Sequence, residues 1–112
     1  MTNLMRPRRL RSSPVIREMI RETHLSANNF IYPMFVTAQA SSEIKSMPGI
    51  QRYSQDDLLR ELELLAKLGL HSVALFPVID ETLKNSQATE ALNKNNLNLQ
   101  TIRAIKKNFP DL

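Results

Sequence analysis

Two short runs of apolar residues mark the strands that the hydrophobic pattern predicts. They lie at residues 30–36 and 71–77, and each has the length of a buried strand. Both predicted strands are apolar on both faces, which is typical of a parallel sheet covered by helices. Pro33 has no amide hydrogen, so we expect it at a bulge or where one edge of its strand is unpaired.

Between the two runs, apolar residues recur at helical spacing and predict a helix near residues 55–68. Ser54 is a suitable N-cap, and Gly69 is suited to the position just after the last turn. The predicted apolar stripe consists of Leu58, Leu62, Leu65 and Ala66.

Two further helices are predicted near residues 14–23 and 98–108. The first begins at Pro14, a residue suited to the first helical position. The second has Asn98 as its expected cap, and Pro110 ends it. Residues 37–53 are predicted as a polar loop, and residues 78–97 as a long loop with some helical content.

The order strand, helix, strand, helix predicts an α/β fold built from βα repeats. We expect a basic N-terminal arm with a short helix in residues 1–24. Residues 25–112 are expected to form the first βαβα portion of an incomplete (β/α)8 TIM barrel, or of a doubly wound sheet. A closed barrel needs eight strands and ~250 residues. The sequence is therefore expected to be the opening piece of a larger protein.

The charge is concentrated in the first 24 residues, which hold six arginines and two glutamates. The other 88 residues hold nine basic and nine acidic groups, so the arm accounts for the whole net charge of +4. Arginine without lysine favours fixed, bidentate partners such as carboxylates, hence a protein surface. A nucleic-acid-binding module is the alternative, but it lacks the aromatic residues and neighbouring lysines typical of such a surface.

Composition narrows the classes of protein that remain. The 112 residues include no cysteine, which excludes a disulfide framework and a thiolate metal site within them. No apolar run approaches ~18 residues, so no membrane span is predicted. No glycine-rich phosphate loop is present. These features favour a cytoplasmic protein.

Four segments resemble porphobilinogen synthase (delta-aminolaevulinic acid dehydratase). They are the arginine-rich start at residues 6–11, the strand at 30–36, the Met47-Pro48-Gly49 segment with Arg52-Tyr53-Ser54 after it, and the run 68–77. Their order and separations are highly specific. The resemblance covers nearly the whole chain and about the first third of the family's length.

The resemblance implies a fold, a reaction and a set of partners. The fold is a (β/α)8 barrel whose N-terminal arm embraces a neighbouring subunit in an octamer-like homo-oligomer. The family condenses two 5-aminolaevulinate molecules to porphobilinogen in haem biosynthesis, using two Schiff-base lysines and a divalent metal, zinc or magnesium. Residues expected to hold the neighbour are Arg6, Arg8, Arg9 and Arg11. No partnership with nucleic acid or membrane is expected.

No catalytic, cofactor-binding or metal-binding residue is predicted in this chain. None of the lysines lies on a predicted strand; they are Lys45, Lys67, Lys84, Lys94, Lys106 and Lys107. The chain alone is therefore expected to be inactive. Asp80 and Glu81 follow the second strand on the side where barrel enzymes place catalytic groups, but a solvated loop explains them better. The alternatives left open are a nucleic-acid-binding module and a non-catalytic piece that engages intact synthase subunits.

Overall fold

A four-stranded mixed sheet forms the centre of the computed structural model, which describes residues 8–112. The strands are β1 (Tyr32–Val36), β2 (Ser42–Glu43), β3 (Gln51–Tyr53) and β4 (Val73–Pro77). Their order in the sheet is β2-β3-β1-β4. Strand β1 pairs in parallel with both β3 and β4, whereas β2 is antiparallel to β3. The predicted parallel pairing of the two main strands is confirmed.

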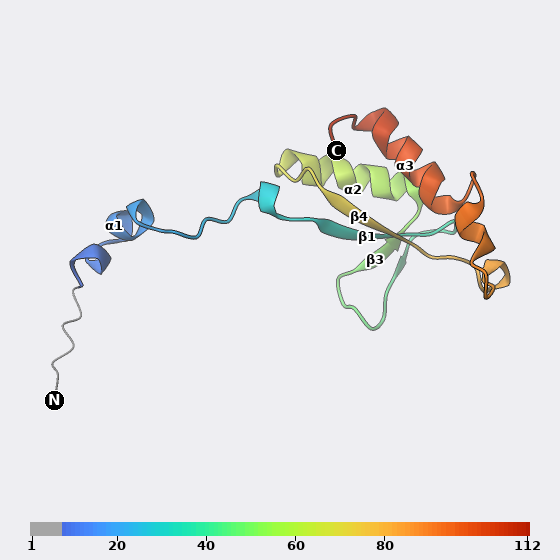
Figure 1. Ribbon diagram of the computed structural model, residues 1–112, viewed down its shortest axis with the longest axis horizontal. Coiled ribbons are helices and arrows are strands. Elements are labelled where there is room, and N and C mark those ends of the chain that lie inside the picture. The colour runs from blue at the N-terminus through green and yellow to red at the C-terminus, as the bar shows by residue number, and fades with distance from the viewer. Residues whose placement is uncertain (1–7) are drawn as a thin grey trace.

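Two helices, α2 (Gln55–Lys67) and α3 (Leu97–Asn108), cover one face of this sheet (Figure 1). Alternate residues of β1 point toward them and meet the apolar stripes of both helices. The buried core is Met34, Val36, Leu58, Leu62 and Ile105. The other face of the sheet has no helix on it among the described residues. Parallel strands covered by helices are typical of folds built from βα repeats.

Local chemistry sets the ends of α2 and the place of β1. The Ser54 side chain accepts a hydrogen bond from the Asp57 amide, as the N-cap prediction requires. Gly69 ends the helix with a φ of +82°, a conformation that a side chain disfavours. Pro33 lies on β1 where only β4 is paired, because β3 reaches no further than Phe35. The expectation of one unpaired edge at Pro33 is therefore confirmed.

The N-terminal segment stands away from the sheet (Figure 1). It contains the short 3-10 helix η1 (Arg9–Arg11) and helix α1 (Pro14–Met19). The radius of gyration is 21.8 Å, against about 13 Å for a compact chain of this length. Helix α1 ends at Met19, short of the predicted end, because a helix this short gains little without a tertiary partner.

Two sequence predictions are wrong in detail. Residues 37–53 are not only loop, because β2 and β3 form a small antiparallel pair that adds a strand beside β1. The cap of α3 is Asn96, whose side chain accepts from the Leu99 amide, and not Asn98. Several neighbouring asparagines are equally suited to cap this helix, so the sequence pattern alone did not select one.

The remaining short turns are η2 (Ala27–Asn29), η3 (Glu81–Leu83) and η4 (Thr89–Leu92). The last two confirm the helical content expected in residues 78–97. No helix in residues 8–112 is long and apolar enough to cross a membrane.

Candidate functional site at the carboxyl end of β4

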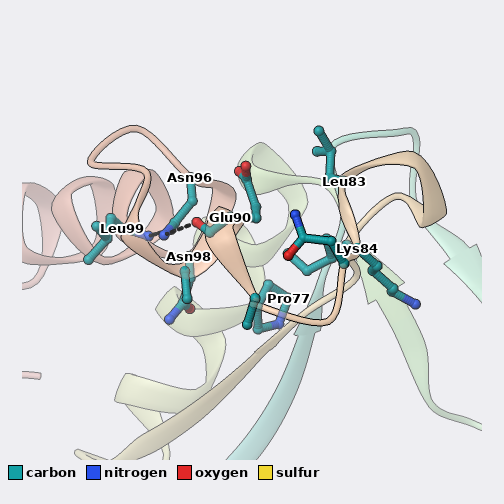
Figure 2. Close-up of a pocket in the computed structure, with 11 residues that line it drawn as sticks. Pro77, Leu83, Lys84, Glu90, Asn96, Asn98 and Leu99 are labelled. Atoms are coloured by element: carbon teal, nitrogen blue, oxygen red, sulfur yellow. Dashed lines mark hydrogen bonds between the residues drawn. The ribbon is translucent and has the colours of Figure 1, made fainter.

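A hollow of about 540 Å³ opens where β4 ends and the chain returns to α3 (Figure 2). Residues 78–96 fold over this end of the sheet and form most of its wall. Its apolar lining consists of Pro77, Ile79, Leu83, Ala88, Ala91 and Leu99. The polar lining consists of Lys84, Asn85, Glu90, Asn96 and Asn98. Ligands of parallel α/β proteins bind at this end of the strands, so the hollow is the candidate site.

Two asparagines form the wall of the hollow on the α3 side. Asn96 is buried, and its Oδ1 accepts from the Leu99 amide at 2.9 Å while its Nδ2 donates to the Glu90 carbonyl at 3.3 Å. Asn96 therefore fastens the loop to the helix. The Oδ1 atom of Asn98 is buried and has no hydrogen-bond partner. A buried carbonyl without a donor lowers stability, which makes Asn98 the unusual residue of the site.

The acidic residues after β4 are used in the loop itself. The Asp80 carboxylate caps η3, accepting from the Thr82 amide at 2.9 Å and from its hydroxyl at 2.7 Å. The Thr82 hydroxyl, and then the Thr82 amide, hold the pKa of Asp80 below its ordinary value of 3.8. Glu81 is paired with the Lys84 amine and is exposed. Both carboxylates are engaged within the loop, and neither is among the residues that line the hollow.

Lys84 is the lysine that lines the hollow, a placement that the sequence did not reveal. Figure 2 shows its amine directed away from the other lining side chains, and that amine is paired with Glu81. Within residues 8–112, no three His, Cys, Asp or Glu side chains come together to hold a metal ion. The described residues therefore offer no ligand set for a metal ion.

The other residues singled out from the sequence lie elsewhere. Phe76 is half-exposed on the helix-free face, where its ring lies 5.6 Å from that of Phe35. His71 lies at the amino end of β4, in a groove beside α3. His24 is exposed in the segment between α1 and the sheet. The arm residues Arg8, Arg9 and Arg11 are exposed, while Arg6 lies outside the described residues.

Tyr53 belongs to the core rather than to the hollow. It is half-buried on β3 and packs against the buried cluster. Burial, with smaller contributions from Glu61 and Tyr32, raises the pKa of its phenol above 10.0. The phenol is therefore protonated at neutral pH and supplies no base.

The fold and the position of the hollow define a class of protein. Parallel strands with helices on one face, and loops gathered over their carboxyl ends, are those of a βα-repeat protein. The chain belongs to the delta-aminolevulinic acid dehydratase family, because the family's sequence model matches residues 4–112.

Individual relatives agree with this assignment. The delta-aminolevulinic acid dehydratase of Bradyrhizobium diazoefficiens is 42% identical over 110 residues, which are 96% of this chain and 31% of the relative. The protein of the same name from Chlamydia pneumoniae is 42% identical over 109 residues, 33% of its length. The chain thus spans about a third of the length of these relatives.

A solved structure extends the likeness to three dimensions. The porphobilinogen synthase of Toxoplasma gondii, crystallised with its product porphobilinogen, matches with a TM-score of 0.92 at 38% identity. The match covers 96% of this chain and 31% of that one.

Proposed function

We propose that this chain is the N-terminal third of a porphobilinogen synthase, which condenses two 5-aminolaevulinate molecules to porphobilinogen. The observation that carries the proposal is the family match over residues 4–112 together with the helix-covered parallel pair β1 and β4. In that protein β1 and β4 are the first two parallel strands of a (β/α)8 barrel, with β3 as an additional short strand beside the carboxyl end of β1. The bare face of the sheet faces the barrel interior.

The 112-residue chain alone does not run the reaction. Two amine nucleophiles must converge on two substrates inside a site closed to water. Lys84 lines the hollow at the carboxyl end of β4, and its amine is occupied by Glu81. We therefore infer that the reacting lysines belong to polypeptide other than residues 8–112. The same holds for the ligands of the divalent metal that the family resemblance implies.

The arm is proposed to hold a neighbouring subunit in a homo-oligomer. Arg8, Arg9 and Arg11 are exposed, and so are the apolar side chains of Val15 and Met19 on α1, at 66% and 80%. A segment that is both basic and apolar, and whose described part stands away from the sheet, suits an acidic, partly apolar protein surface. A cytoplasmic location stays a prediction, because chloroplastic proteins are also among the relatives.

The test is to join residues 1–112 to the part of the Bradyrhizobium diazoefficiens relative that follows its matched segment. We expect the joined protein to form porphobilinogen from 5-aminolaevulinate with zinc or magnesium. The 112-residue chain alone is expected to show no turnover and no borohydride-trapped adduct on any lysine. An inactive but correctly folded joined protein contradicts the proposed function, and turnover by the short chain contradicts its proposed inactivity.

A further inference from the structure

We draw no further inference here: the strongest candidate, the hollow at the carboxyl end of β4 with the unpartnered Oδ1 atom of Asn98 in its wall, belongs to the site already described, and nothing in the structure shows what would supply a hydrogen-bond donor to that oxygen.

Discussion

The arm (residues 1–24) and the rest of the chain, here called the body (residues 25–112), have helices that begin in the same way and differ in length. Helix α1 follows the cap Ser13 and helix α2 follows the cap Ser54, and each serine accepts from a backbone amide in the first turn. Helix α2 continues for 13 residues against the sheet, whereas α1 ends after 6 with no buried residue. Local signals therefore start a helix, and its length depends on what it packs against.

The largest expected effect on stability is at the buried core, whose residues all lie in the body. Leu62 is fully buried on α2, so Leu62→Ala is expected to lower the free energy of unfolding by about 2–5 kcal/mol. Leu64→Ala on the same helix and Val15→Ala on α1 remove exposed side chains and are expected to change it by less than about 0.5 kcal/mol. Urea unfolding followed by circular dichroism measures all three. A large effect of Val15→Ala shows that the arm packs on its own body.

The arm is expected to matter only when a neighbour is present. Changing both Arg8 and Arg9 to Glu leaves the unfolding of the 112-residue chain unchanged, because both side chains are exposed. In the protein joined to its relative's remainder, we expect the same change to reduce the oligomer size measured by sedimentation. Lys94→Glu with Lys107→Glu is the control, since it makes the same change in charge on the body. Unchanged oligomer size in the arm variant contradicts the proposed role.

The sequence predicted the body better than its connections. Strands β1 and β4 and helix α2 were predicted within two residues, because buried runs and capped stripes are local patterns. The pair β2 and β3 was missed, since Ser42, Glu43 and Gln51 have no apolar alternation and gain their order from β1. The hollow was missed because its wall brings together Pro77, Leu83 and Asn98, which no motif links in the sequence.

A smaller effect on stability is expected at Ser41, whose hydrogen bonds tie the segment before β2 to the start of α2. The Ser41 hydroxyl accepts from the Ser54 amide at 2.8 Å and donates to the Asp57 carboxylate. Ser41→Ala leaves that amide without an acceptor, so we expect a loss of about 1–2 kcal/mol in the free energy of unfolding. Ser42→Ala, at the exposed neighbouring position, is expected to have no effect. Equal stability of the two variants shows that the tie is not important.

The same tie predicts a dependence on pH. Hydrogen bonds from Ser41 and Ser54, with a smaller contribution from Arg60, hold the pKa of Asp57 below its ordinary value of 3.8. The folded state therefore binds fewer protons than the unfolded one. The stabilisation is present above pH 3.8 and is lost as the pH falls through the lowered pKa. We expect Asp57→Asn to flatten this acid limb in unfolding measurements and the exposed-site variant Asp56→Asn to retain it.

The smallest effect concerns Asn98, and it has the opposite sign. Its buried Oδ1 has no donor, so Asn98→Leu, which keeps a side chain of similar size, removes an unsatisfied carbonyl from an apolar wall. We expect the free energy of unfolding of the 112-residue chain to rise by about 1 kcal/mol. Asn95→Leu, at an exposed position just before α3, is expected to leave it unchanged. A residue that weakens the isolated body is suited to a partner that supplies the missing donor. A loss of stability in Asn98→Leu shows instead that the Asn98 amide already has its hydrogen-bond partner within the chain. The body, unlike the arm, then needs no neighbour at this position.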